Sequence, residues 1–114
     1  MNQFYHSTRG AGDSVTSKQA ILRGIAPDGG LYVADWLGEK ALDLAVVCGQ
    51  GFHETARQVL GTLLPDYTAD ELASCVDAAY GPQWDTPAVT PVTPLGNDWL
   101  LELYHGPTSA FKDV

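Results

Sequence analysis

The chain has 114 residues and a mass of 12.2 kDa, with 45% apolar and 18% charged residues. This size and composition are typical of one globular domain and exclude a disordered or low-complexity protein. A formal net charge of −8 argues against general attraction to nucleic acid or to an anionic membrane. No apolar run is long enough to span a bilayer and no signal peptide is evident, so we expect a cytoplasmic protein.

The first third of the sequence predicts two short strands and one short helix. Aromatic and β-branched residues place strands near 3–7 and 31–33. Between them, a helix begins at a cap provided by Thr16 or Ser17 and stops at Gly24. The turn before the second strand is rich in Pro, Asp and Gly, as turns are.

The middle of the sequence predicts helices. Residues 36–49 favour only a helical turn or two, because Gly38 weakens the pattern. Apolar residues then recur at helical spacing from Phe52 to Leu63, and a capping box at Thr68 opens a second helix that ends at Gly81-Pro82. We therefore expect three or more helices over residues 17–80 and an α+β fold.

The last third is rich in proline and then apolar. Residues 82–94 predict an extended linker with a strand near 91–94, and 99–103 predict another strand. Because isolated strands need partners and the middle is helical, we expect the strands near the two ends to pair with each other. The final residues predict the first turn of a helix capped by Thr108 or Ser109, and an element cut so short indicates a fragment.

The sequence offers no cysteine or metal motif. Cys48 and Cys75 lie 27 positions apart in apolar surroundings, and we interpret both as reduced core thiols. The three histidines are scattered without metal-ligand spacing, so we expect no bound metal.

Lys112 is the only basic side chain after Arg57. A position in the first turn of a helix, beside Phe111, would lower the pKa of the amine, and a neutral amine can act as a nucleophile. The alternative is a solvated surface lysine that forms a salt bridge with Asp113 or Glu102.

Ser7, Thr8 and Arg9 form a second candidate site. One guanidinium with two hydroxyls beside a glycine could hold a phosphate or a carboxylate. The alternative is a strand end that carries a surface arginine. His105 suggests a general base, but a lone histidine beside a turn more often has a structural role.

Three blocks of the sequence resemble the N-terminal portion of threonine synthase. They occur in the expected order and are Tyr5–Gly10 (YHSTRG), Ser17–Val33 (SKQAILRGIAPDGGLYV) and Leu101–Asp113 (LELYHGPTSAFKD). The last block is similar to the family's pyridoxal-phosphate attachment segment, with Lys112 at the Schiff-base position. Residues 34–90 match only in general helical character.

This resemblance implies a fold-type II pyridoxal-phosphate enzyme that converts O-phospho-L-homoserine and water into L-threonine and phosphate. Lys112 would carry the cofactor, Phe111 would pack near it, and the substrate would approach Ser7–Arg9. Residues 1–95 would form the N-terminal domain, and 96–114 would begin the catalytic domain. Family members are several times longer, so we expect the remainder of the catalytic domain to be a partner and this chain alone to be inactive.

Two other hypotheses remain open. A threonine-synthase-like phospholyase would share the motifs but release a keto acid and ammonia. A small acidic interaction module would instead bind a partner through the apolar helical face between Phe52 and Ala79. Exposed apolar surface, above all at 99–103, also predicts self-association of the chain.

Overall fold

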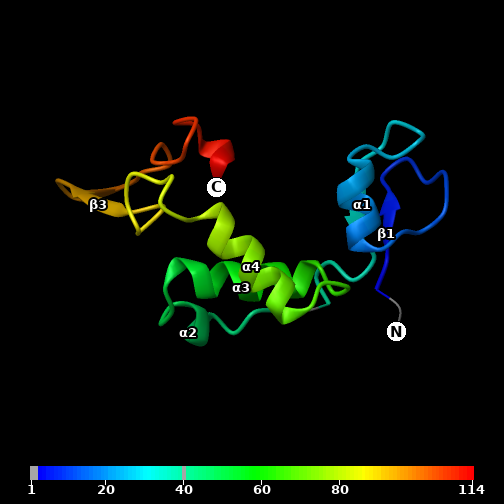
Figure 1. The fold of residues 1–114 in the computed structure, drawn as a ribbon, viewed down its shortest axis with the longest axis horizontal. Helices are drawn as coiled ribbons and strands as arrows, with labels where there is room; N and C mark the ends of the chain where they lie inside the picture. The colour runs from blue at the N-terminus through cyan, green and yellow to red at the C-terminus, as the bar shows by residue number, and fades with distance from the viewer. Residues whose placement is uncertain (1–2, 40) are drawn as a thin grey trace.

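The computed structural model describes residues 3–39 and 41–114. The chain is elongated, with principal extents of 49 × 31 × 30 Å, and runs from an N-terminal lobe through a helical centre to a projecting hairpin (Figure 1). The predicted α+β architecture is confirmed. The elements in chain order are β1 (Tyr5–Ser7), α1 (Ser17–Arg23), β2 (Tyr32–Ala34), α2 (Leu44–Val47), α3 (Phe52–Leu63), α4 (Ala69–Ala79), β3 (Val92–Leu95), β4 (Asp98–Leu101) and the 3-10 helix η1 (Phe111–Asp113).

The N-terminal lobe consists of β1, α1 and β2. The two strands pair in antiparallel register, with Tyr5 opposite Ala34. Thr16 caps α1 in a capping box with Gln19, and Gly24 ends the helix with a positive φ of 73°, which glycine adopts at little cost. The predicted helix bounds are therefore confirmed.

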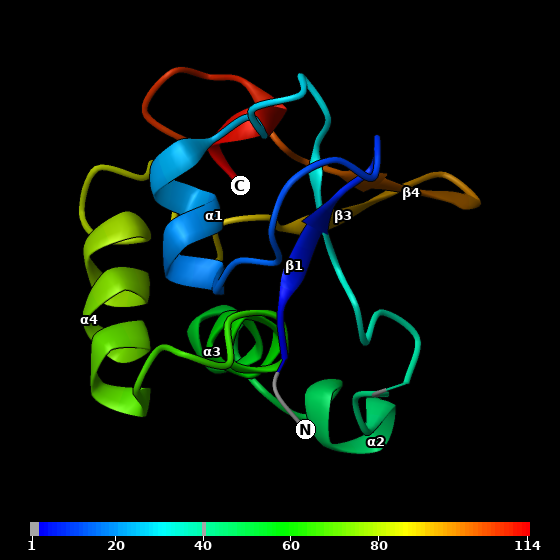
Figure 2. The ribbon, with the colours of Figure 1, turned by 90° about the vertical axis from the view of Figure 1, so that its right-hand side faces the viewer.

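The helical centre consists of α3 and α4, which pack against each other, with the single turn α2 beside them (Figure 2). Thr68 and Glu71 form the predicted capping box at the start of α4. Leu72 and Val76, which lie on α4, are buried. At the far end of α4, Tyr80 packs edge-on against Phe52, with ring centroids 4.8 Å apart.

The proline-rich segment after α4 belongs to the core rather than to a linker. Trp84 and Val89 are 7% and 1% exposed. The indole of Trp84 donates a hydrogen bond to the carbonyl of Ala79 over 2.8 Å. Sequence reasoning missed both residues because proline spacing conceals any apolar periodicity.

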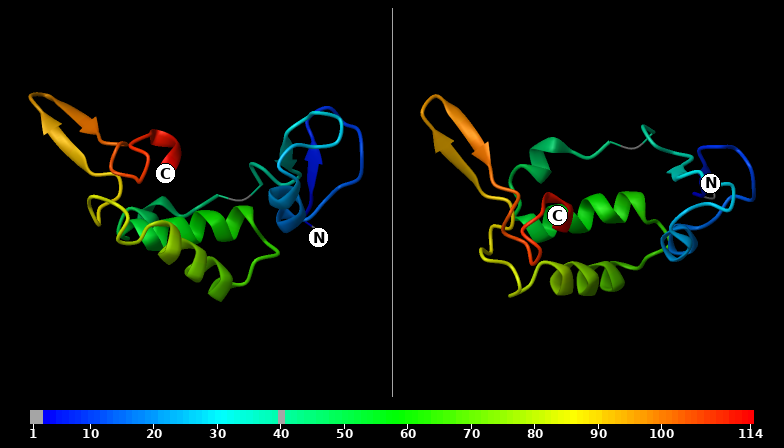
Figure 3. Two further views of the ribbon diagram at one scale, coloured as in Figure 1. Left: turned by 45° about the horizontal axis from the view of Figure 1, so that its top comes forward. Right: turned by 90° about the horizontal axis from the view of Figure 1, so that it is seen from above.

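The expected pairing between strands at the two ends of the chain is wrong. β1 pairs with β2, and β3 pairs with β4, each in its own two-stranded sheet. A two-residue connection, Gly96-Asn97, joins β3 to β4, and a local hairpin avoids the entropy cost of closing a long loop. This hairpin projects from the helical centre (Figure 3).

The cysteines also differ from expectation. Cys48 and Cys75 are free thiols, but both are exposed rather than part of the core. Cys75 lies on α4, whose buried face is formed instead by Leu72 and Val76. None of the helices described here has the length and apolar character required to cross a bilayer.

Candidate functional site

Lys112 lies on η1 and is exposed. The element is a single turn of 3-10 helix, whose N-cap is Ala110. The predicted cap by Thr108 or Ser109 is therefore wrong, because the Thr108 hydroxyl is used elsewhere. The Phe111 side chain is 66% exposed, so it does not shield the amine from water in this chain.

The carboxylates proposed as salt-bridge partners of Lys112 are occupied. Asp113 accepts two hydrogen bonds from Thr108, and Glu102 contacts His105. Within residues 3–39 and 41–114, no ion pair of Lys112 is formed. The interpretation of Lys112 as half of a surface salt bridge is therefore not supported by this geometry.

Glu102 and His105 form a polar cluster at the base of the hairpin. Glu102 Oε2 lies 2.6 Å from His105 Nε2, and Glu102 Oε1 accepts a hydrogen bond from Thr93 over 2.9 Å. The hydrogen bond with His105, followed by that from Thr93, holds the pKa of Glu102 below its ordinary value. The cluster joins β3 to the turn that leads to Lys112.

The C-terminal segment is fixed at two points, one at the end of α4 and one in the segment that follows α4. Tyr80 donates its hydroxyl to the carbonyl of Val114 over 2.6 Å. The amide of Asp85 donates to the carbonyl of His105 over 3.0 Å. The segment therefore lies over the end of α4, on the same side of the helices as α1 (Figure 1).

The second candidate site is a folded turn rather than an open anion site. Ser7 donates its hydroxyl to Asp28 over 2.7 Å, and Arg9 Nη1 donates to the carbonyl of Asp28 over 2.9 Å. The Thr8 hydroxyl accepts the amide of Leu31 over 3.0 Å. The hydrogen bond from Ser7, then that from the Gly30 amide, lowers the pKa of Asp28.

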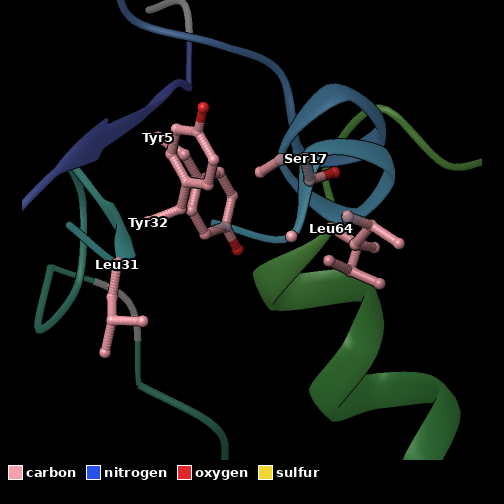
Figure 4. A pocket seen from close by; sticks show the side chains of 8 residues that line it. Tyr5, Ser17, Leu31, Tyr32 and Leu64 are labelled. Carbon is pink, nitrogen blue, oxygen red and sulfur yellow. The ribbon is translucent and has the colours of Figure 1, made fainter. Parts of the chain in front are cut away.

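The structure does not bring these two candidate sites together. The β1 end and the C-terminal turn lie apart along the long axis of the molecule in both views of Figure 3. A cavity of about 400 Å³ lies in the N-terminal lobe, between β1, β2 and α1 (Figure 4). Its walls include Tyr5, Leu31 and Leu64, and the buried hydroxyl of Tyr32 has no partner among the described residues.

The comparisons with known proteins agree with this fold. The sequence model of the family described as "Threonine synthase N terminus" matches residues 4–80. Threonine synthase from Pseudomonas aeruginosa is 39% identical over 96% of the chain, which spans 24% of that protein. The corresponding protein from Methylobacillus glycogenes is 36% identical over 96% of the chain and 25% of its own length. Human threonine synthase-like 1 is 33% identical over 84% of the chain, but only 14% of that protein is covered.

Two solved structures share the fold. Pyridoxal-phosphate-bound threonine synthase from Brucella melitensis superposes with a TM-score of 0.84 at 34% identity, over 99% of this chain and 25% of that one. Threonine synthase from yeast gives a TM-score of 0.80 at 26% identity, over 96% and 23%. The chain thus spans about a quarter of the length of the threonine synthases it matches. It belongs to the threonine synthase N-terminal family.

Proposed function

We propose that this chain acts as the N-terminal part of a threonine synthase, which converts O-phospho-L-homoserine and water into L-threonine and phosphate. The observation that carries the proposal is the similarity to threonine synthases over 96% of the chain, with the lysine-bearing segment at its end. Because the chain spans only a quarter of those proteins, the rest of the catalytic domain would supply most of the substrate pocket. We expect the 114-residue chain alone to be inactive.

Lys112 is the proposed attachment point of pyridoxal phosphate. Its exposed primary amine, free of any ion pair in the described part of the chain, fits this role. The cofactor, when bound, supplies an electron sink for carbanion chemistry. The Lys112 amine would then move protons at Cα and Cβ of the substrate. The exposed Phe111 ring would pack against the cofactor.

Ser7, Thr8 and Arg9 remain the proposed substrate-side residues. The Ser7 hydroxyl and Arg9 Nη1 both donate to Asp28, so these two groups hold the turn rather than offer free donors. The Thr8 hydroxyl accepts the amide of Leu31. The exposed remainder of the Arg9 guanidinium would be the group that contacts an anionic substrate.

The predicted boundary between the two domains falls inside the β3–β4 hairpin. A boundary between residues 95 and 96 would separate the paired strands β3 and β4. We propose that the catalytic domain instead begins before β3, in the segment that follows α4. We also propose a cytoplasmic location, because free thiols are typical of reducing compartments.

The decisive experiment locates the cofactor lysine in a threonine synthase that contains this chain. Borohydride reduction of the cofactor-loaded enzyme, followed by peptide mass spectrometry, should place the label on Lys112. Lys112→Ala should abolish turnover. Lys112→Arg should abolish it too, because a guanidinium stays charged and does not attach the cofactor. Lys18→Ala, which removes the half-exposed lysine of α1 that pairs with Glu71, is the matched control and should leave turnover intact. A label on another lysine would show the assignment to be wrong.

A phospholyase is the second candidate, supported by the similarity to threonine synthase-like 1. The same assay separates the two activities by product. Formation of L-threonine and phosphate supports the synthase, whereas a keto acid with ammonia supports the phospholyase.

A further inference from the structure

Residues 106–113, here called the Lys112 loop, are closed by one carboxylate. Asp113 Oδ2 accepts the backbone amide of Thr108 over 2.8 Å, and Asp113 Oδ1 accepts the Thr108 hydroxyl over 2.5 Å. Both carboxylate oxygens therefore bind a residue that lies five positions earlier in the chain. The ring formed by these bonds carries Lys112, directly before Asp113.

The interior of the ring is closely packed. Gly106 is buried, and a Cβ added there would come within 2.5 Å of Asp113 Cβ and Oδ2. The amide of Ser109 donates to the carbonyl of Gly106 over 3.0 Å, and Ser109 itself has a positive φ of 56°. The Lys112 loop is thus tightly packed, and in this geometry only glycine fits at position 106.

Asp113 is available as a charged acceptor. The hydrogen bonds from the Thr108 hydroxyl and then the Thr108 amide lower the pKa of Asp113, so the carboxylate is ionised at neutral pH. Hydrogen bonds to an ionised acceptor are stronger than those between neutral groups. The same two bonds direct the carboxylate toward Thr108 and away from the adjacent ammonium.

We infer that Asp113 is a positioning residue, which fixes the Lys112 loop on Thr108 so that the Lys112 amine is presented free of a carboxylate partner. This inference rests on the proposed function, in which Lys112 holds the cofactor. The contact of Asp113 with Thr108, here called the Asp113 clamp, fixes the backbone next to Lys112 and so limits the directions that the Lys112 side chain can take. Such preorganisation affects the chemical step more than substrate binding.

The test compares Asp113→Ala with Asp113→Asn in a threonine synthase that contains this chain. Loss of the carboxylate should lower kcat at least about tenfold with little change in KM, because positioning acts in the transition state. Cofactor labelling of Lys112 under borohydride should slow in parallel. Asp113→Asn should keep most of the parent kcat and most of the parent labelling rate. The asparagine amide oxygen can accept the Thr108 N–H, and its amide nitrogen can donate to the Thr108 hydroxyl. Asp13→Ala, in an exposed loop, is the control and should match the parent enzyme.

Two further variants cover the case in which Asp113→Ala fails to fold. Thr108→Val removes only the hydroxyl bond and should give an intermediate loss. Gly106→Ala should disturb the same ring from its interior. In the 114-residue chain, amide hydrogen exchange at Thr108 should accelerate in Asp113→Ala but not in Asp13→Ala.

The outcomes separate the two proposals. If the label maps to Lys112 and folded Asp113→Ala keeps the parent kcat and labelling rate, the positioning role is overturned and the proposed function stands. If the label maps elsewhere, the proposed function fails. Equal losses in Asp113→Asn and Asp113→Ala would also overturn the Asp113 clamp, because asparagine preserves its hydrogen bonds.

Discussion

Asp66 links the loop between α3 and α4 to the start of α1. Its carboxylate accepts hydrogen bonds from the hydroxyl of Ser17, which is 1% exposed, and from the amide of Lys18 at 3.1 Å. Burial acts to raise the pKa of Asp66, but the bonds from Ser17 and Lys18 outweigh it, and the pKa lies below its ordinary value. One carboxylate therefore ties the N-terminal lobe to the helical centre.

A lowered pKa in the folded state makes this link sensitive to acid. The stabilisation is fully present above the ordinary carboxyl pKa and is lost as pH falls through the lower, folded value. Asp66→Ala should reduce the free energy of unfolding at neutral pH by about 1–3 kcal/mol, because the Ser17 hydroxyl and the Lys18 amide lose their acceptor. It should also flatten the decline in stability between about pH 5 and pH 3. Urea denaturation across this range checks both effects, with the exposed Asp98→Ala as control. An unchanged acid dependence would contradict the role of Asp66.

At the residue scale, Val89 has a strained backbone conformation. It is 1% exposed yet has a positive φ of 57°, a conformation that β-branched residues rarely adopt. Val89→Ala keeps the backbone strain and loses buried methyl groups, whereas Val89→Gly relieves about 1–2 kcal/mol of strain. We expect the glycine variant to be as stable as the alanine variant or more so. At an ordinary buried position the alanine variant is the more stable of the two. Chemical denaturation that shows Val89→Ala to be more stable than Val89→Gly would therefore refute backbone strain at this position.

At the scale of elements, α4 depends on its N-terminal cap. The Thr68 hydroxyl accepts the amide of Glu71, and the Glu71 carboxylate accepts the amide of Thr68 over 2.8 Å. Thr68→Ala should lower the free energy of unfolding by about 1 kcal/mol, because the first-turn amide loses its acceptor. Thr68→Ser keeps a hydroxyl and should recover most of the loss. Thermal and urea unfolding measure the difference, and equal stabilities of all three proteins would exclude a contribution from the cap.

Helices and caps could be predicted because their determinants are local. The stripe from Phe52 to Leu63 and the capping box at Thr68 each lie within a few turns of chain. The prediction of the strand partners failed because pairing depends on which segments meet in the folded chain. Gly96-Asn97 between two apolar runs is nevertheless a recognised hairpin signal. The burial of Trp84 accompanies its contact with the end of α4, five residues earlier, which apolar periodicity does not reveal.

The candidate site was predictable in part for the same reason. The resemblance singled out Lys112, but its surroundings depend on contacts between residues several positions apart. Local propensity favoured Thr108 as a helix cap, whereas the hydroxyl closes the Lys112 loop on Asp113. Likewise, Glu102 is used by His105 and Thr93 rather than by the lysine. Competition between partners for a few carboxylates decided the outcome, and spacing alone does not reveal it.

At the scale of the whole molecule, the projecting hairpin carries a cluster of exposed apolar side chains. Its five large apolar side chains are between 44% and 71% exposed, with Leu100 at the lower and Trp99 at the upper value. Contiguous exposure of this kind is uncommon in monomers. The unpaired edges of a two-stranded sheet also offer backbone groups to another strand. We propose that, in the 114-residue chain, β3–β4 hairpins from two copies associate.

Sedimentation velocity of the 114-residue chain should therefore show a mass that rises with concentration. Trp99→Lys should suppress this association, because a charged side chain on the hairpin opposes both burial and edge pairing. Leu22→Lys is the matched control, since Leu22 is even more exposed, at 87%, but lies on α1 in the N-terminal lobe. The control should associate like the parent chain. Equal suppression by both variants would place the contact elsewhere or make it nonspecific, and a parent chain that stays monomeric at every concentration would contradict the association itself.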